Sequence, residues 1–255
     1  MLNAQPISAP SEAIVAGEIV GSAFVIEKNV TIGCNCSIFS TKVKGKPLTE
    51  LFAVKIEKDS IHQSVLNNEK LVIQSIKNSK HYAKIIESGR HKQSNYIVTQ
   101  FLGPNLRDLA LRQHQNTLTL QALMKFAYQA IEALQALHSA GFVHGAVNAK
   151  NFLIGYSKET VDNFYLIDFS TCIPYNYSDT TREFDLLGIM KIVQEYYSKE
   201  GLHASQNSQQ FLPPEFQEFS QAIYQLTPKA IPDYSSLLQI LIKTSMLLRN
   251  QDHVD

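Results

Sequence analysis

The chain has 255 residues, of which 44% are hydrophobic, enough for one large domain or two lobes with a buried core. Its 23 lysines and arginines balance its 23 aspartates and glutamates. A formal net charge of zero excludes the broad positive field that draws proteins to nucleic acids or anionic membranes, so we expect neither as a partner.

The chain also lacks the sequence signals of a membrane or secreted protein. No stretch reaches the ~18 consecutive apolar residues of a membrane span, and the first twenty residues lack the basic start and apolar core of a signal peptide. The three cysteines, Cys34, Cys36 and Cys172, lack the paired spacing of a zinc site, and we interpret them as reduced thiols. We therefore expect an intracellular protein of the cytoplasm or nucleus.

The first half of the chain is predicted to be rich in strands. Residues 1–18 are rich in Ser, Pro, Ala and Glu, and we expect a flexible N-terminal segment there. From Phe24 to Ile61, short β-branched runs alternate with turn residues, which predicts an antiparallel meander. The apolar residues of 62–78 fall at helical spacing, and two further strands follow in "YAKIIESGR" and "NYIVTQFLG".

The second half is predicted to be mostly helical. Apolar residues from Leu120 to Leu137 repeat at the spacing of a buried amphipathic helix that stops at Gly141. "FLIG" and "FYLIDF" follow as short strands, and the later helices are separated by Pro-marked turns. This order indicates a small β-rich unit with one helix, a connector, and a larger helical unit, an arrangement that often binds ligands between its two parts.

Four short motifs occur in a fixed order along these elements. "FAVKIE" places Lys55 near the end of a predicted strand, as in the V-A-I-K motif, whose lysine contacts nucleotide phosphates. Glu69 follows on the predicted helix as the natural ion-pair partner of that lysine. "FVHGAVNAKNFLIG" stands where H-R-D-x-x-x-x-N belongs, and "LIDFS" stands where D-F-G belongs.

The chain therefore resembles a protein kinase over roughly residues 24–245. "FLGPNLRDL" and "IPDYSSLLQIL" are similar to the hinge and late helices of the casein kinase 1 group, which includes the tau-tubulin and vaccinia-related kinases. The resemblance implies an α+β, bilobal protein kinase-like fold: a small antiparallel β-sheet N-lobe (19–103) with one main helix, and a larger, mostly helical C-lobe (104–250) with a shortened activation segment. Together they form a single kinase-like domain over 19–250.

The resemblance also implies a nucleotide site that takes ATP with Mg²⁺. The expected cofactor-binding residues are Gly33, Lys55, Glu69, Gln100 and Leu102. The expected metal ligands are the side-chain oxygens of Asn151 and Asp168. The alternative is that no cofactor binds, and that Lys55 and Glu69 merely hold the helix to the sheet while Asn151 and Asp168 satisfy loop and turn groups.

Several positions depart from the kinase pattern. Ala146 occupies the place of the catalytic aspartate, and a methyl group can neither accept a proton nor orient an attacking oxygen. Asn148 replaces the loop lysine, and Gly145 replaces the arginine that anchors activation segments. Gly33 remains from the glycine-rich loop without its later glycines, and only about a dozen residues separate Asp168 from the next helix.

These departures lead us to expect no catalytic residues and no enzyme activity: a catalytically inactive pseudokinase of the casein kinase 1 group. It would act as a protein-binding scaffold or allosteric regulator, with an active kinase or its substrate as partner. The sequence does not determine its oligomeric state. The alternative is an atypical, weak ATP-dependent protein serine/threonine phosphotransferase that uses Asp168 and metal without a base, since a loose transition state needs little early proton abstraction. A third alternative is a scaffold that binds no nucleotide, its cleft filled by side chains such as Ile38 or Phe39.

Overall fold

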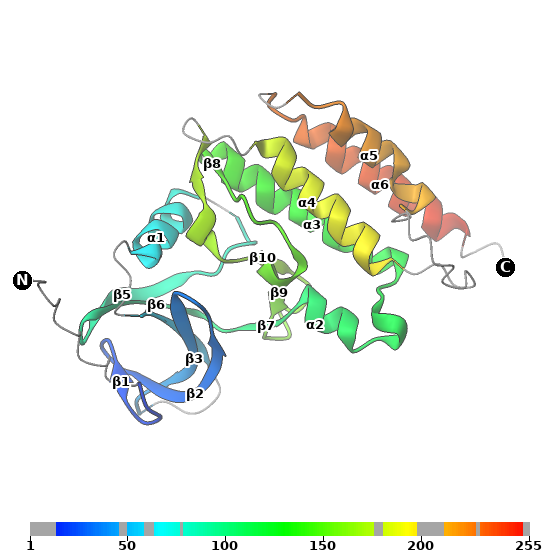
Figure 1. Ribbon diagram of the computed structural model, residues 1–255. Helices are drawn as coiled ribbons and strands as arrows, with labels where there is room; N and C mark the ends of the chain where they lie inside the picture. Colours follow the sequence, from blue (N-terminus) through cyan, green and yellow to red (C-terminus); the bar gives the residue numbers. More distant parts are fainter. Residues whose placement is uncertain are drawn as a thin grey trace, which may run out of the picture. The chain divides into compact units, whose positions relative to one another are not determined.

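The structure is a computed structural model (Figure 1). It describes residues 14–45, 50–58, 64–76, 79–175, 181–197, 212–227 and 230–251. Residues 1–13 of the predicted N-terminal segment and residues 176–180 of the predicted activation segment lie outside this description.

The chain divides into two compact units. The described residues up to Asn67 form the first unit together with Lys84–Phe101, and Asn68–Ala83 forms the second with the residues from Leu102 onward. Residues 68–83, which the sequence placed in the N-lobe, thus group with the second unit. The predicted lobe boundaries themselves stay predictions.

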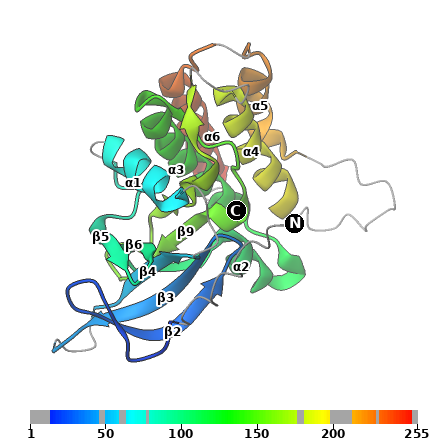
Figure 2. The ribbon, with the colours of Figure 1, turned by 60° about the vertical axis from the view of Figure 1, so that its left-hand side comes forward.

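The first unit is a six-stranded antiparallel sheet in the order β1-β2-β3-β4-β6-β5 (Figure 2). Its strands are β1 (Ile19–Val20), β2 (Phe24–Ile32), β3 (Cys36–Val43), β4 (Phe52–Glu57), β5 (Ile85–His91) and β6 (Ser94–Gln100). The predicted antiparallel meander is confirmed, because β2, β3 and β4 pair in chain order.

Alternation of side chains along β4 gives this sheet its core. Phe52, Val54 and Ile56 are buried on one face and pack in a cluster with residues of β2, β3 and β6. Because successive side chains of a strand point to opposite faces, Lys55 lies on the other face, beside Ile97 of β6 in the register. The strand therefore separates its core residues from its candidate functional lysine.

The second unit is mostly helical. Its longer elements are α1 (Val65–Ser75, from Asn68 onward), α2 (Leu106–Leu111), α3 (Leu120–Ser139), α4 (Arg182–Tyr196), α5 (Gln217–Tyr224) and α6 (Tyr234–Gln251). Helices α3, α4, α5 and α6 run side by side (Figure 1). Short strands complete the unit: β7 (Leu102–Asn105) pairs with β9 (Phe152–Gly155), which also pairs with β10 (Phe164–Leu166), and β8 (Phe142–Val143) pairs with β11 (Ile173–Pro174).

Helix α3 is the centre of this unit's core. The Thr119 side chain caps its start by accepting a hydrogen bond from the Ala122 N–H at 3.2 Å. Its apolar face, which includes fully buried Phe126, Leu134 and Leu137, meets the large core cluster of the unit. Gly141 follows its last turn with a φ of 90°, a left-handed conformation that glycine adopts without strain.

Both units confirm the predicted α+β class, with a small antiparallel sheet and a larger helical part. Leu102–Asn105, which the sequence indicated as a connector, forms strand β7 and leads directly into α2. None of the helices that the structure describes is long and apolar enough to cross a membrane.

Candidate active site

The segment that aligns with the kinase catalytic loop begins directly after β8 and is held by a buried carboxylate. Asp185, in the first turn of α4, is fully buried. One of its oxygens accepts from the His144 N–H at 2.7 Å and the other from the Gly145 N–H at 2.9 Å. Gly145 has a φ of 75°, so a residue without a Cβ permits the turn that presents both N–H groups to the carboxylate.

The loop closes on the carbonyl of the alanine that replaced the expected base. The Ala146 carbonyl oxygen accepts from Asn148 Nδ2 at 2.9 Å and from Asn151 Nδ2 at 3.0 Å. Asn148 Oδ1 in turn accepts from the Lys150 N–H at 2.9 Å and caps the short helical turn Ala149–Asn151. Because the Asn151 amide nitrogen is engaged, its oxygen is the atom left to act as a ligand.

Asp168 lies in a segment that is tied to this loop. The Ile167 N–H donates to the Asn151 carbonyl oxygen at 2.9 Å, so the two predicted metal-ligand positions are brought together. Asp168 has a φ of 66°, a left-handed conformation that costs a non-glycine residue about 1–2 kcal/mol. Strain of this kind persists where the surroundings enforce it, often at functional sites. The carboxylate also accepts from Ser170 Oγ at 2.8 Å.

The donor set of Asn151 and Asp168 fits Mg²⁺. Magnesium binds carboxylate and amide oxygens, commonly one or two from the protein with the rest from substrate phosphates and water. Within the described residues, no three His, Cys, Asp or Glu side chains gather into a metal-binding group. A metal ion here would therefore need further oxygens from a nucleotide or from water. Its binding by these two side chains stays a prediction.

Buried rings support the segment after Asp168. The Phe169 ring lies 5.7 Å from Tyr82 and 5.6 Å from His144, measured between centroids. His144 Nε2 donates to the Ile167 carbonyl at 3.1 Å, and burial lowers the pKa of His144, which favours the neutral ring. Asn68 of α1 donates to two carbonyl oxygens of the segment, those of Phe169 at 3.0 Å and Cys172 at 2.9 Å.

Three of the predicted nucleotide residues lie in the first unit. The Gly33 N–H donates to the Cys36 carbonyl at 2.9 Å and closes the turn between β2 and β3. Lys55 is in β4 between Ile38 and Ile97 of its neighbouring strands, and Gln100 ends β6. Glu69 of α1 and Leu102 of β7 belong to the second unit, so the pairing of Lys55 with Glu69 stays a prediction.

A buried carboxylate that the sequence analysis missed fixes the start of α1. Glu57, the last residue of β4, is 6% exposed. Its oxygens accept from Ser64 Oγ, the Leu66 N–H and Asn95 Nδ2, each at 2.8 Å. An anion that receives N–H groups at a helix N-terminus is favourable because it satisfies groups with no partner inside the helix. Glu57 thus anchors the helix that carries Glu69.

Sequence reasoning missed Glu57, Asn68 and Asp185 for one reason. Each acts on residues far from it in the sequence or across a turn, and none belongs to a short motif. A signal was present only for Asp185, an acidic residue within the apolar run "FDLLGIM" of a helix. A charge at such a position is seldom buried unless it is paired or hydrogen-bonded.

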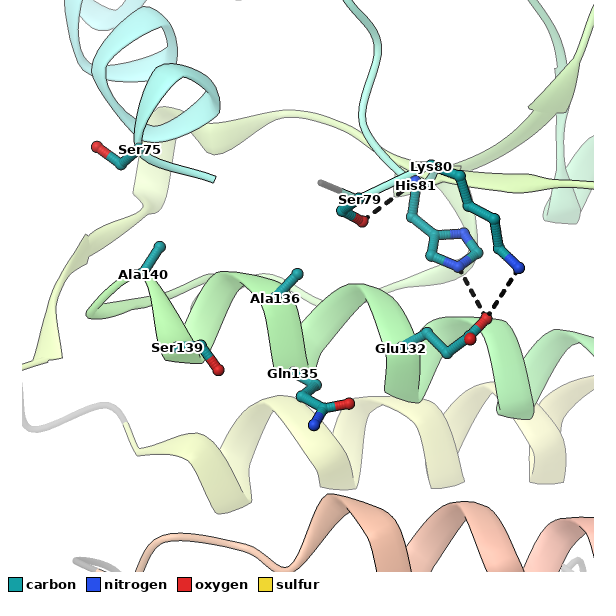
Figure 3. Close-up of a pocket in the computed structure, with 9 residues that line it drawn as sticks. All are labelled: Ser75, Ser79, Lys80, His81, Glu132, Gln135, Ala136, Ser139 and Ala140. Atoms are coloured by element: carbon teal, nitrogen blue, oxygen red, sulfur yellow. Dashed lines mark hydrogen bonds and ion pairs between the residues drawn. The ribbon is translucent and has the colours of Figure 1, made fainter. Parts of the chain in front are cut away.

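A surface pocket of about 760 Å³ lies beside α3, apart from the candidate site (Figure 3). It is lined by Ser75, Ser79, Lys80, His81, Glu132, Gln135, Ala136, Ser139 and Ala140. Figure 3 shows His81 and Lys80 converging on Glu132, with Nε2 and Nζ at 3.0 and 3.3 Å from Oε2. The lining includes no residue of the loop 144–151 or the segment 168–171.

Comparison with known proteins points to one family. The model of the family described as protein tyrosine and serine/threonine kinase matches residues 24–210. The chain is similar to a Dictyostelium discoideum protein named "Probable serine/threonine-protein kinase", with 33% identity over 156 residues, 60% of this chain and 31% of the relative. Two Caenorhabditis elegans proteins are more distant: "Putative casein kinase I", 28% identical over 117 residues (42% of this chain, 34% of the relative), and "Serine/threonine-protein kinase spe-6", 26% identical over 121 residues (47% and 32%). The chain spans about a third of the length of these relatives.

These findings correct one expectation. From Ala146, Asn148 and the short segment after Asp168 we expected that the chain is not an enzyme, but the relatives are named as serine/threonine-protein kinases and the family model is that of kinases. The expectation was wrong because it gave decisive weight to the groups that are missing from the kinase pattern. Phosphoryl transfer depends mainly on positioning and electrostatic stabilisation, to which many groups contribute. With its antiparallel sheet, its helical second unit and a match over most of its length, the chain belongs to the protein tyrosine and serine/threonine kinase family.

Proposed function

We propose that the chain is an atypical, weak ATP-dependent protein serine/threonine phosphotransferase of the casein kinase 1 group. The observation that carries the proposal is the junction of Asn151 with the Asp168 segment through the 2.9 Å bond from the Ile167 N–H. This junction keeps two oxygen ligands of the kinase pattern on neighbouring segments. The names of the relatives, one of them a casein kinase I, support the reaction and the group.

The residues have separable roles in the proposed reaction. Kinase domains of this family generally bind ATP with Mg²⁺, whose charge offsets the negative charge that develops on the transferred phosphoryl group. Asp168 and Asn151 would hold the metal, and Lys55 would contact the nucleotide phosphates. Asp185 holds the backbone of His144 and Gly145, and would so keep the loop in the position that the acceptor hydroxyl requires.

The weakness of the activity follows from Ala146. A positioned general base contributes typically about 10²–10⁴-fold to such a rate. Here the proton of the acceptor hydroxyl passes to water or to a phosphoryl oxygen, because no carboxylate stands at position 146. The loose transition state tolerates this loss, since the oxygen–phosphorus bond to the acceptor is still weak when the barrier is crossed.

The test measures transfer of labelled phosphate from ATP with Mg²⁺ by the purified chain, to itself and to a serine/threonine peptide library read by mass spectrometry. We expect slow transfer that Asp168→Asn and Lys55→Ala abolish. Asp162→Asn is the matched control, because that side chain lies between β9 and β10, is 82% exposed and forms an ion pair with Lys125. No transfer by the wild type, or transfer that Asp168→Asn leaves unchanged, would overturn the proposal.

Nucleotide binding is tested separately by thermal unfolding. A ligand at about 100 times its Kd stabilises a protein by about 2.7 kcal/mol. We expect ATP with Mg²⁺ to raise the melting temperature of the wild type and of Asp162→Asn, and not that of Asp168→Asn. An equal rise in Asp168→Asn would show that this carboxylate does not hold the metal.

We also infer a role as a scaffold or allosteric regulator for a protein partner, an active kinase or its substrate. Ala146 favours this second role, because loss of the base slows the chemical step without requiring any change in surfaces that bind proteins. The test adds the purified chain to a serine/threonine kinase that copurifies with it and measures the rate of that kinase. A rate that depends on the chain's concentration supports the role, and a constant rate contradicts it.

A further inference from the structure

We infer that Tyr234, the first residue of α6, is a positioning residue for the catalytic loop and acts through a buried relay of hydrogen bonds formed with His138 and Asp185. The effect of this relay on phosphate transfer rests on the proposed function. The relay itself rests on contacts within the second unit.

The relay joins three helices to the loop. His138, in the last turn of α3, contacts Asp185 Oδ2 through Nε2 at 2.8 Å, and its Nδ1 contacts the hydroxyl of Tyr234. The three side chains are almost inaccessible to solvent, with exposed fractions of 4%, 0% and 7% for His138, Asp185 and Tyr234. Buried polar groups of this kind form directional bonds that water does not replace.

The direction of each bond follows from the chemistry of the groups. Burial raises the pKa of Tyr234 well above its ordinary value, so the hydroxyl keeps its proton, and in the proposed relay it donates a hydrogen bond to His138 Nδ1. An imidazole that accepts at Nδ1 carries its N–H on Nε2, which donates to Asp185. The Tyr234 hydroxyl thereby selects the tautomer that places a donor, and not a lone pair, against the carboxylate.

Asp185 passes this constraint to the loop. Its carboxylate receives three donors: the ring N–H of His138 and the backbone N–H groups of His144 and Gly145. If Nδ1 of His138 loses its donor, the ring proton can move to that nitrogen, and the carboxylate then faces a lone pair. Asp185 becomes freer to shift, and with it the two N–H groups that begin the loop. Outer hydrogen bonds of this kind orient inner groups at many active sites.

The chain offers a matched control for the Tyr234 hydroxyl. Tyr82 is also buried, 6% exposed, and its hydroxyl also donates to an α3 group, the Ala133 carbonyl, at 2.6 Å. Neither Tyr82 nor Ala133 contacts Asp185 by a hydrogen bond. Tyr82→Phe and Tyr234→Phe therefore remove the same group from similar surroundings, and only the second removes it from the relay.

The primary test uses nitrogen-15 NMR and hydrogen exchange on the full chain. The ring signals of His138 are identified by their absence in His138→Gln. We expect a wild-type ring protonated at Nε2 alone, and mixed tautomers in Tyr234→Phe. Exchange of the His144 and Gly145 N–H groups should accelerate roughly tenfold in Tyr234→Phe, as expected for the loss of one buried hydrogen bond. Tyr82→Phe should change neither. An unchanged His138 tautomer in Tyr234→Phe, or an equal change in Tyr82→Phe, would overturn the inference.

A kinetic test separates this inference from the proposed function. If the chain transfers phosphate, Tyr234→Phe should lower kcat several-fold and leave the KM for ATP unchanged, because the loop positions the acceptor. A fall in kcat of the same size in Tyr82→Phe would contradict a role specific to the relay. If the wild type transfers no phosphate, the proposed function fails, while the tautomer and exchange results still decide the relay.

Discussion

The carboxylate of Asp185 is expected to be among the most important single groups for the stability of the second unit. It is fully buried and accepts hydrogen bonds of 2.7, 2.9 and 2.8 Å from the His144 N–H, the Gly145 N–H and His138 Nε2. Asp185→Ala leaves three donors without an acceptor in a site closed to water. The substitution therefore creates unsatisfied groups and does not simply remove three favourable bonds.

The size of the effect follows from these contacts. A buried donor left unsatisfied costs about 1–3 kcal/mol. Three such donors would lower the free energy of unfolding by about 3–9 kcal/mol if the surrounding structure did not relax. Breaking a buried polar network typically costs about 3–5 kcal/mol, which is the value we expect for Asp185→Ala. A domain has only about 5–15 kcal/mol of stability, so the variant should be close to unfolding. Asp185→Asn retains the shape and one acceptor oxygen, and should cost about half as much.

Urea unfolding followed by circular dichroism measures the loss, with the slope m confirming that the same surface is exposed in each variant. Asp162→Asn serves as the control and should stay within about 0.5 kcal/mol of the wild type, since its carboxylate is mostly exposed to solvent. A free energy of unfolding for Asp185→Ala within about 1 kcal/mol of the wild type would refute the reasoning, because three unsatisfied buried donors should destabilise the fold by more than that.

Four further predictions test other parts of the site. Ala146→Asp should raise the rate of phosphate transfer by about 10²-fold or more, measured with labelled ATP, because it restores a general base; an unchanged rate would mean that proton acceptance is not limiting. Burial raises the pKa of Cys172 to about 12, so iodoacetamide at about pH 8 should label exposed Cys34 and spare Cys172 until denaturant is added; equal labelling by mass spectrometry would contradict this. Glu57→Ala should lower the free energy of unfolding by about 2–4 kcal/mol in urea titrations, since it removes the acceptor of two groups at the start of α1 and of Asn95 in β6. A loss below about 0.5 kcal/mol would argue against that cap. Burial lowers the folded-state pKa of His144, so the free energy of unfolding should be constant above the unfolded-state pKa of about 6.5 and fall as the pH decreases below it. Urea midpoints measured across this pH range should decline less in His144→Phe than in the wild type. An equal decline in both proteins would mean that other groups cause the pH dependence.

Much of the fold was predictable from the sequence because its signals are local. The alternation of Phe52, Val54 and Ile56 predicts a strand with one buried face, and the repeat from Leu120 to Leu137 predicts a helix. Both patterns depend only on the geometry of neighbouring residues. Asn151 and Asp168 were predicted as ligands for the same reason, since each lies within a short motif of defined spacing, and that role stays a prediction.

The supports of the site were decided only by the tertiary structure. Asp185 contacts residues 40 and 41 positions before it, and Tyr234 contacts His138 across 96 positions. No short-range pattern encodes such pairs, because they depend on how helices α3, α4 and α6 pack. The same limit explains the mistaken expectation drawn from Ala146 and the other departures from the kinase pattern. A missing side chain is visible in a sequence, but the contribution of the groups that remain depends on their positions in space. The sequence by itself thus determined the elements and the motif residues, while packing of distant segments decided which buried groups hold them in place.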